Sequence, residues 1–376
     1  MNKILKEAMN KKQNHQITYE EFMNIALYDP EKGYYQKENQ KIGQKGDFYT
    51  SSSVGTVYGE VIASVFCSFV KNNLVGLTFV EVGGGNGRFA NSFLTYCKKN
   101  EPTVYSKLNY ILVDESNFHQ LLQKEMLIEH SNVKFYSGLT EMQQVVEGVI
   151  FSNELFDALP VRVVEFQNER WHEVVLTYNE DDKLVERYIE IDDIKINEFL
   201  DRHQFHGKKG QRLEIPLVME RVFNNMQSKL INGMIITVDY GFNREEWDAP
   251  HRLKGSLRGY HQHEMKTNVL DLIGEMDLTT HIHWDELKHI GLQKEIDQVY
   301  FSTQRNALLD FGILNWLIQH AQVNPFSEEY KQNRAVQSLI MPGGISDSFQ
   351  LLIQTKGIAD DLKQEINELI SLNEYK

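Results

Sequence analysis

The residues whose types and spacing point most directly to chemistry are Glu81 to Gly87, which read Glu-Val-Gly-Gly-Gly-Asn-Gly. They follow an apolar run from Leu77 to Val82 that predicts a buried strand, and they precede a pattern from Arg88 to Lys98 that predicts a helix. Glycines at such a turn remove Cβ atoms, so a ligand can approach the backbone. A dinucleotide fingerprint needs the order G-x-G-x-x-G, and only a looser variant from Gly85 to Ala90 is present. The turn therefore predicts a cofactor site, with NAD as the weaker alternative.

The same glycine turn contains the full spacing E-x-G-x-G-x-G. This spacing resembles that of class I S-adenosylmethionine-dependent methyltransferases, whose cofactor has no pyrophosphate to place on a helix N-terminus. The resemblance implies S-adenosylmethionine as the cofactor. The residues expected to bind it here are Glu81, Gly83, Gly85, Asn86 and Gly87.

An acidic residue, Asp114, ends the next apolar run, Leu108 to Val113. Open α/β sheets bind ligands at the carboxyl ends of their strands, so we expect this carboxylate to accept both ribose hydroxyls. A solvated strand end is the alternative. A third strand is predicted from Val133 to Tyr136, and Leu139 after it is expected beside the adenine.

Two carboxylates, Glu154 and Asp157, follow the strand predicted from Val145 to Ile150, where this fold places a substrate-facing loop. Because they are three residues apart, one helical turn would put both on the same side. Paired carboxylates suit a guanidinium, which stays charged and offers a planar set of donors. We therefore expect an arginine as the methyl acceptor. Positioning of its guanidinium by these charges would supply most of the rate. An acidic helix start that stabilises its own dipole is the alternative.

Histidines gather in a polar and aromatic segment, Asp277 to Trp284, predicted to be a loop before a helix. His281 is a candidate proton acceptor. Alternation also places it beside His283, and a similar pair occurs at His261 to His263, but third and fourth metal ligands are missing, so we predict no metal. Two further residues are candidates for the substrate mouth, although exposed loop residues would show the same pattern: Arg258 and Tyr260.

The composition limits partners and location. The net charge of -14 opposes nonspecific binding to nucleic acid or to an anionic membrane and favours a basic partner. The two cysteines, Cys67 and Cys97, have no paired spacing, so we expect neither disulfides nor zinc but a reducing, cytoplasmic location. We see no targeting segment, and the best apolar stretch, Val61 to Val70, is too short to span a membrane and predicts a buried helix.

Periodicity divides the chain into four expected regions. Residues 1–74 are predicted to form an N-terminal helical lid region, with a capping box at Thr18 to Glu21. Residues 75–160 alternate strand and helix, which predicts the cofactor-binding half of a parallel sheet. Residues 161–212 are expected to be an inserted β-rich substrate region, and residues 213–376 to complete the sheet with added helices. Later elements are expected as helices at Leu213 to Leu230 and Thr303 to Gln322 and strands at Met234 to Asp239 and Phe349 to Gln354.

Seven motifs in this order resemble the MidA-like methyltransferases along nearly the whole chain. That family includes the mitochondrial complex I assembly factor that methylates an arginine of a partner subunit, and bacterial members whose targets are not established. This chain departs from the family pattern at Gly84, where a proline is usual, and at Met341 to Gly344, before the last strand. The motifs are Tyr28 to Tyr35, Gly46 to Ser51, Glu81 to Gly87, Ser152 to Val161, Asp239 to Gly241, Gly255 to Tyr260 and Asp277 to His281.

The resemblance implies an α/β class I methyltransferase fold. Its mostly parallel, seven-stranded, Rossmann-like sheet would carry helices on both faces, an N-terminal helical extension and an inserted β-meander. It also implies cofactor contacts from Asp47, Thr50, Ser51 and Asn153, a substrate contact from Tyr240, and acceptor binding by the Glu154 loop with His281 nearby. The predicted activity is methylation of an arginine on a partner protein. A small-molecule methyltransferase and an assembly or binding protein with a cofactor site are the alternatives, and the oligomeric state is not predicted.

Overall fold

The computed structural model describes residues 1–37, 55–319, 324 and 327–371, and it separates into two compact units. We call them the sheet unit, Tyr49–Leu155, Phe223–Tyr240 and Lys288–Lys376, and the insert unit, Met1–Phe48, Phe156–Val222 and Gly241–Leu287. The chain passes from one unit to the other between Leu155 and Phe156. Glu154 therefore belongs to the sheet unit, while Asp157 and His281 belong to the insert unit.

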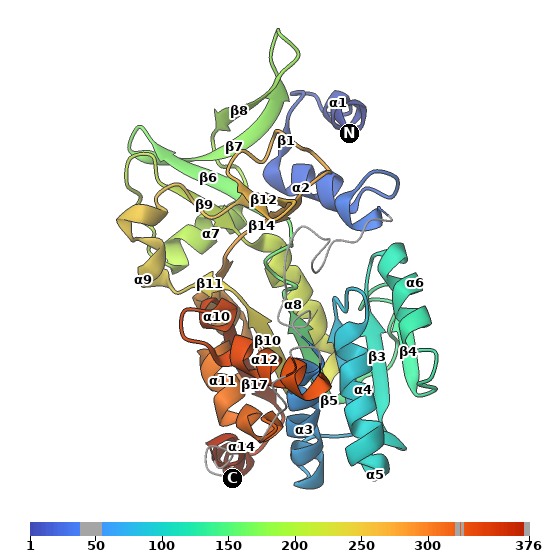
Figure 1. Ribbon diagram of the computed structural model, residues 1–376. Helices are drawn as coiled ribbons and strands as arrows, with labels where there is room; N and C mark the ends of the chain where they lie inside the picture. The colour runs from blue at the N-terminus through green and yellow to red at the C-terminus, as the bar shows by residue number, and fades with distance from the viewer. Residues whose placement is uncertain (38–54, 320–323, 325–326, 372–376) are drawn as a thin grey trace. The chain divides into compact units, whose positions relative to one another are not determined.

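Seven strands of the described chain form the main sheet, in the order β16-β17-β10-β5-β2-β3-β4 (Figure 1). The run from β10 to β4 is parallel, whereas β17 is antiparallel to both of its neighbours. This confirms the predicted mostly parallel sheet. The strands are β2 Thr78–Val82, β3 Asn109–Val113, β4 Val133–Tyr136, β5 Val146–Asn153, β10 Leu230–Asp239, β16 Asp297–Thr303 and β17 Gln350–Lys356.

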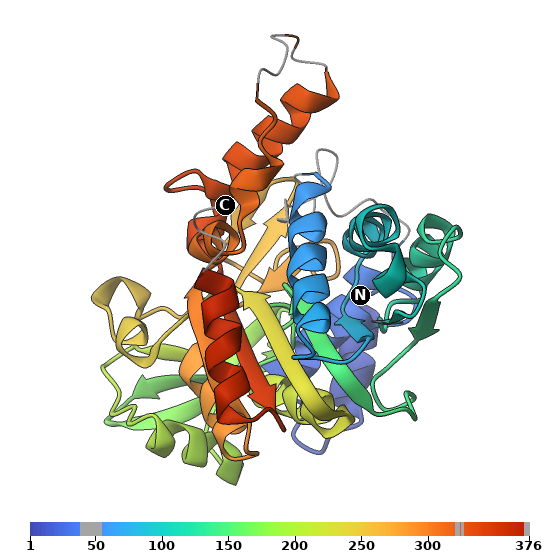
Figure 2. The same ribbon diagram turned by 90° about the horizontal axis from the view of Figure 1, so that it is seen from below.

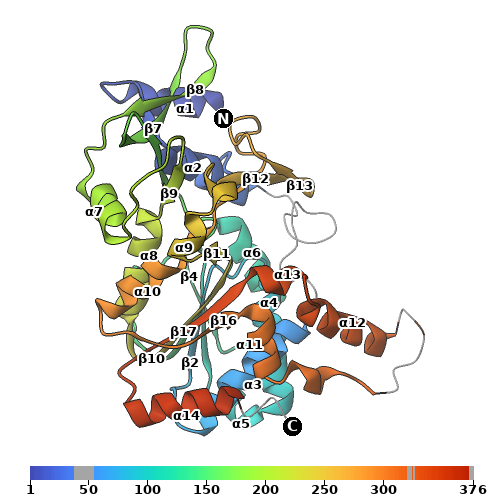
Figure 3. The same cartoon turned by 90° about the vertical axis from the view of Figure 1, so that its left-hand side faces the viewer.

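Helices cover this sheet because each turns an apolar stripe toward it. Side chains of α3, α4, α11, α12 and α14 share one core cluster with strand residues such as Phe79 and Phe151. Figure 2 shows α3 and α4 side by side, and Figure 3 shows them with α11 on one side of β10 and β17. The helical segments of this unit are α3 Val57–Lys71, α4 Arg88–Asn100, α5 Pro102–Tyr105, α6 Asn117–Met126, α11 Gln304–Asp310, η4 Ile313–Trp316, α12 Glu328–Ile340, α13 Ile345–Ser348 and α14 Asp360–Ser371; α8 Leu217–Lys229 and α10 Trp284–Leu292 continue from one unit into the other.

The insert unit is built on an antiparallel sheet, in which β1, β7, β6 and β9 are consecutive neighbours and β8 pairs with β7. Successive side chains of β6 point to opposite faces of this sheet and pack in two different cores. Val163 packs with α1 and α2, and Val164 packs with α7. The predicted capping box is confirmed at Thr18 and Glu21, where α2 begins. The elements are α1 Asn2–Asn10, β1 Ile17–Thr18, α2 Tyr19–Tyr28, η1 Tyr34–Gln36, β6 Arg162–Gln167, β7 Arg170–Tyr178, β8 Leu184–Ile189, α7 Ile194–Arg202, β9 Arg212–Ile215, β11 Gly241–Phe242, α9 Arg244–Trp247, η3 Pro250–Arg252, β12 Arg258–His261, β13 Glu264–Lys266, β14 Asp277–Thr279 and β15 Ile282–His283.

Three element predictions were wrong in ways that have physical reasons. The helix expected from Leu213 begins only at Leu217, because residues 212–215 pair with β6 and Pro216 separates the two elements. The helix expected from Thr303 ends at Asp310, where Gly312 adopts a left-handed conformation (φ 77°). The loop expected at residues 277–283 contains β14 and β15, whose partners are distant in sequence.

Candidate functional site

The strand ends of the sheet unit bring the predicted cofactor residues to one edge. Because β3, β2, β5 and β10 are adjacent and parallel, their carboxyl ends meet there. The glycine turn follows β2, Asp114 follows β3, and Glu154 follows β5. The glycine turn, Asp114 and Glu154 are about 30 and 40 residues apart in the sequence, but they follow strands that lie close together in the sheet.

The glycine turn is held in a conformation that side chains rarely adopt. Gly83, Gly85 and Gly87 have φ values of 78°, 52° and 81°. Gly83 is exposed and the next three residues are half-buried, so the backbone of the turn is open to a ligand. The Asn86 side chain accepts a hydrogen bond from the Arg88 amide (3.2 Å) at the start of α4. The turn therefore has the open glycine backbone expected of a cofactor site.

Asp114 is already engaged by three donors. Its Oδ2 accepts from the Gly85 amide (3.1 Å) and from Gln123 Nε2 (3.0 Å), and its Oδ1 accepts from the Ser116 amide (2.9 Å). A carboxylate offers about four acceptor positions, so this arrangement leaves room for one more donor. That Asp114 accepts from the ribose hydroxyls stays a prediction. Gln123 was not predicted from the sequence, because a polar residue within a helix pattern carries no signal of its distant partners.

Glu81 is buried within the sheet unit, where Tyr110 donates a hydrogen bond to its Oε2 (2.6 Å). The pKa of this carboxyl is raised to about 8, mainly by burial; the Tyr110 hydrogen bond acts to lower it and the charge of Asp114 to raise it. Near neutral pH the protonated form is thus favoured in the folded protein. Its contact with Tyr110 links β2 to β3 beneath the glycine turn.

This pKa makes a stability prediction for the Glu81→Gln variant of the ligand-free protein. Between pH 4.5 and about 8 the folded protein retains a proton that the unfolded chain has released, so wild-type stability should fall as pH rises through this window. Glutamine does not titrate and still accepts from Tyr110. We expect the variant to gain about 5 kcal/mol over wild type at pH 9 and almost nothing at pH 4. Urea unfolding at both pH values measures the difference in the free energy of unfolding. The same difference between variant and wild type at pH 4 and pH 9 would contradict the raised pKa of Glu81.

The donors and acceptors at this edge fit S-adenosylmethionine. The glycine backbone is accessible, and Asp114 has one acceptor position left beside it. Asn153 supplies a side-chain amide at the end of the adjacent strand. Backbone amides and carbonyls, a carboxylate and a side-chain amide are groups with which the ribose hydroxyls and the amino-acid end of the cofactor can form hydrogen bonds.

Glu154 is held in a strained position at the end of β5. Its φ of 53° is left-handed, which is costly for a residue with a side chain, and its amide donates to the Val238 carbonyl (2.9 Å). Asn153 Nδ2 donates to Glu154 Oε1 (2.9 Å), and the hydroxyl of buried Tyr58 donates to Asn153 Oδ1 (2.7 Å). The predicted helical turn from Glu154 was wrong, because this backbone bends at the strand end. Tyr58 was missed because its position in α3 predicts only a core aromatic.

In the insert unit, a turn at residues 156–159 carries Asp157, which is 5% exposed. Its carbonyl accepts from the Thr280 amide (2.9 Å), and the Tyr28 hydroxyl donates to the Ala158 carbonyl (3.0 Å). Tyr28 begins the first of the seven family motifs and Thr280 belongs to the last. The fold thus joins three motifs around this turn.

His281 lies against cations and an aromatic ring. Arg258 Nη2 donates to His281 Nδ1 (2.6 Å), and the imidazole stacks on Phe242 at 4.1 Å. The pKa of His281 is lowered to about 2, mainly by burial and also by the charges of Arg258 and Arg252. The imidazole is therefore neutral over the physiological range. In this environment His281 is better suited to accept a hydrogen bond from Arg258 than to take up a proton.

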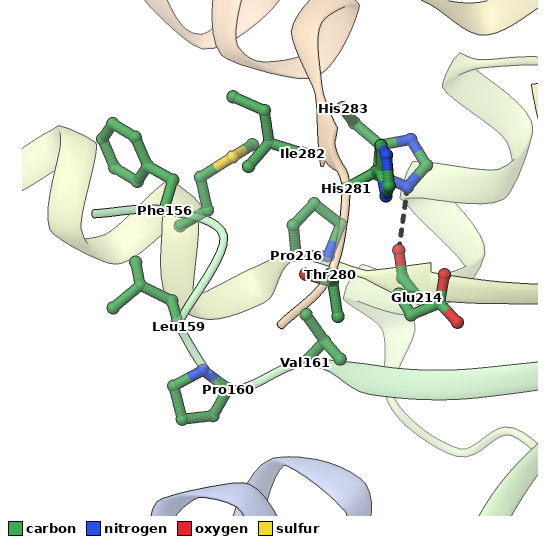
Figure 4. A pocket seen from close by; sticks show the side chains of 11 residues that line it. Phe156, Leu159, Pro160, Val161, Glu214, Pro216, Thr280, His281, Ile282 and His283 are labelled. Atoms are coloured by element: carbon green, nitrogen blue, oxygen red, sulfur yellow. Dashed lines mark hydrogen bonds between the residues drawn. The ribbon is translucent and has the colours of Figure 1, made fainter. Parts of the chain in front are cut away.

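Glu214 on β9 organises the segment that leads to Arg258. Its buried carboxylate accepts from the Ser256 amide (2.9 Å), the Ser256 hydroxyl (3.0 Å) and the Leu257 amide (3.2 Å), and Ser256 Oγ accepts from the His281 amide (2.9 Å). Figure 4 shows Glu214 beside a small pocket, with its carbonyl hydrogen-bonded to His283 Nε2 (2.9 Å). The pocket has a volume of about 10 Å³. It can hold a water molecule but not a substrate.

The remaining predicted residues are distributed over both units. Leu139 is buried in a turn after β4, and Tyr240 packs edge-on against Phe349 in the sheet unit. Tyr260 lies half-buried in β12 of the insert unit. The described part of the chain contains no cluster of three or more His, Cys, Asp or Glu placed to hold a metal ion. Three predicted cofactor contacts lie outside the described residues: Asp47, Thr50 and Ser51.

The strand order, the antiparallel β17 and the glycine turn after β2 define a class I methyltransferase fold. The chain belongs to the MidA-like family of S-adenosyl-L-methionine-dependent methyltransferases, whose model matches residues 61–302. It is therefore a methyltransferase that uses S-adenosylmethionine, as the motifs predicted.

Relatives and solved structures agree with this assignment. The chain is 24% identical to the mitochondrial protein arginine methyltransferase NDUFAF7 of Danio rerio, over 89% of this chain and 82% of that protein. It is 24% identical to the Homo sapiens protein of the same name, over 77% of this chain and 69% of that protein. A Burkholderia thailandensis protein crystallised with S-adenosyl-homocysteine has the same fold, with a TM-score of 0.84 at 22% identity, over 95% of this chain and 93% of that one.

These comparisons correct the expected cytoplasmic location. The curated relatives from fish, rat, fly and human are all named as mitochondrial proteins. The prediction was wrong because unpaired cysteines indicate a reducing environment but do not distinguish one reducing compartment from another. Separately, none of the helices in the described part of the chain combines the length and apolar character needed to cross a bilayer.

Proposed function

We propose that this protein transfers a methyl group from S-adenosylmethionine to an arginine side chain of a partner protein. The observation that carries the proposal is Glu154, a strained carboxylate fixed at the same sheet edge as the glycine turn. Backbone strain of this kind is concentrated at functional sites, where the surrounding structure maintains it. The relatives named as protein arginine methyltransferases support the same acceptor.

When bound, S-adenosylmethionine supplies a methyl group on a positively charged sulfur. The protein's part is to position the acceptor and manage its charge. Glu154 is proposed to bind the guanidinium by charge-assisted hydrogen bonds, which fix its plane and direct one nitrogen. Asp157 is the proposed second carboxylate. Glu154 is also the proposed acceptor of the proton that leaves the nitrogen, because His281, with its pKa lowered to about 2, is a weaker base than an ordinary carboxylate.

The partner is proposed to present a basic surface. The net charge of -14 would attract such a surface and repel an acidic one. Arg258 and Tyr260 remain proposed contacts for other parts of the substrate, since a guanidinium beside Arg258 would be repelled.

The proposal is tested by identifying the methylated product. The protein is incubated with S-adenosylmethionine carrying a tritiated methyl group and with proteins from cells in which methylation was inhibited. Acid hydrolysis and chromatography then reveal which amino acid is labelled, and we expect methylarginine. Label in acid-soluble small molecules or in other amino acids would overturn the arginine acceptor. Cofactor binding without any transfer would favour an assembly or binding role.

A further inference from the structure

Gln123, on α6, connects the two parts of the cofactor site. It is 1% exposed, and its Nε2 lies 2.8 Å from the Gly85 carbonyl and 3.0 Å from Asp114 Oδ2. Both partners accept, so both hydrogens of the amide are used. A single side chain thereby joins the turn after β2 to the acid after β3.

The chemistry of these partners fixes which way the amide points. With the amide reversed, its oxygen would face a carbonyl and a carboxylate, neither of which can donate. In the observed orientation Gln123 Oε1 is buried and has no partner among the described residues. The two donated bonds therefore hold the side chain in place. Only a neutral side chain with two donors can bind both acceptors as Gln123 does, because a carboxylate at this position would be repelled by Asp114.

The helix backbone packs against the same turn. A Cβ added to Gly87 would lie 3.2 Å from Gln123 Cα, and Gly87 is left-handed. Close approach of α6 is thus built into the glycine turn. Direct contacts thus connect the glycine turn, α6 and Asp114.

We propose that Gln123 is a positioning residue for S-adenosylmethionine binding. Its amide fixes the distance between the Gly85 carbonyl and the Asp114 carboxylate. The entropy cost of ordering these two groups is therefore not subtracted from the free energy of cofactor binding. Asp114 keeps its remaining acceptor position for the ligand because Gln123 and the two backbone amides occupy the others. This inference concerns the cofactor and stands whether or not arginine is the methyl acceptor.

Calorimetric titration with S-adenosyl-homocysteine tests it, using full-length Gln123→Met and Gln123→Glu. Methionine keeps the length but removes both donors, and we expect affinity to fall about 10- to 30-fold at every pH. In Gln123→Glu a protonated carboxyl can donate at pH 5.5, whereas the ionised form repels Asp114 at pH 8.5. We expect its affinity relative to wild type to fall at least about tenfold between these pH values.

The control is Gln120→Met on the same helix. Gln120 donates to the backbone carbonyl of Asp114 (2.8 Å), so its loss should change affinity less than about threefold. His119 Nδ1 lies 3.7 Å from Asp114 Oδ2, and Glu81 and Glu115 also lie near Asp114. These groups are the same in every protein tested, so variant-to-wild-type ratios are compared. Binding of Gln123→Met within threefold of wild type, or a Gln123→Glu ratio that is flat with pH, would overturn the proposal. If Gln123→Met fails to fold, the pH ratio of Gln123→Glu decides.

Discussion

Replacing Glu154 by glutamine is expected to lower the rate of methyl transfer on the order of a thousandfold, with affinity for S-adenosyl-homocysteine within about threefold of wild type. Glutamine preserves the size of the side chain and an oxygen that can accept from Asn153 Nδ2. It removes the negative charge that would hold a guanidinium and the group that would take its proton. The loss should therefore appear in catalysis and not in cofactor binding.

The measurement is single-turnover transfer of tritiated methyl into protein methylarginine, with calorimetry on the same preparations. A matched control is Glu147→Gln, an exposed acid near the other end of the same strand, which should leave both quantities unchanged. Normal transfer by Glu154→Gln would reject the proposed acceptor carboxylate. A parallel loss of cofactor affinity would instead reassign Glu154 to the cofactor.

Replacing Asp114 by alanine is expected to weaken S-adenosyl-homocysteine binding about 100-fold. The variant loses the acceptor position offered to a ribose hydroxyl, and it leaves the Gly85 and Ser116 amides and Gln123 Nε2 without this partner. The glycine turn must then be ordered by the ligand, at a further cost in affinity.

Calorimetry with the demethylated product measures this change without requiring an acceptor. Glu115→Ala is the matched control, because it removes an exposed carboxylate from the adjacent residue. An equal loss of affinity for S-adenosyl-homocysteine in both variants would mean that Asp114 acts only through its negative charge and not through specific hydrogen bonds. Affinity of Asp114→Ala within fivefold of wild type would place the ribose elsewhere.

Local patterns in the sequence determined much of the sheet and the class of cofactor. The strand from Val133 to Tyr136 was predicted with its observed bounds, and the capping box before α2 was predicted correctly. Both are set by neighbours within one or two turns, where periodicity and hydrogen-bonding capacity are readable. The glycine spacing and the acid after the next strand indicated the cofactor, because the carboxyl ends of parallel strands meet at one edge.

Only the tertiary structure decided how these residues are held. Cys67 and Cys97 are buried free thiols whose sulfurs lie 3.6 Å apart, although their spacing in the sequence does not indicate that they are close. Tyr58 reaches Asn153 across 95 positions, and Gln123 reaches Gly85 across 38. Such contacts depend on how strands and helices pack, which periodicity along the chain does not encode. The strain at Glu154 has the same origin, since its backbone is bent by a hydrogen bond to a strand that comes 84 residues later.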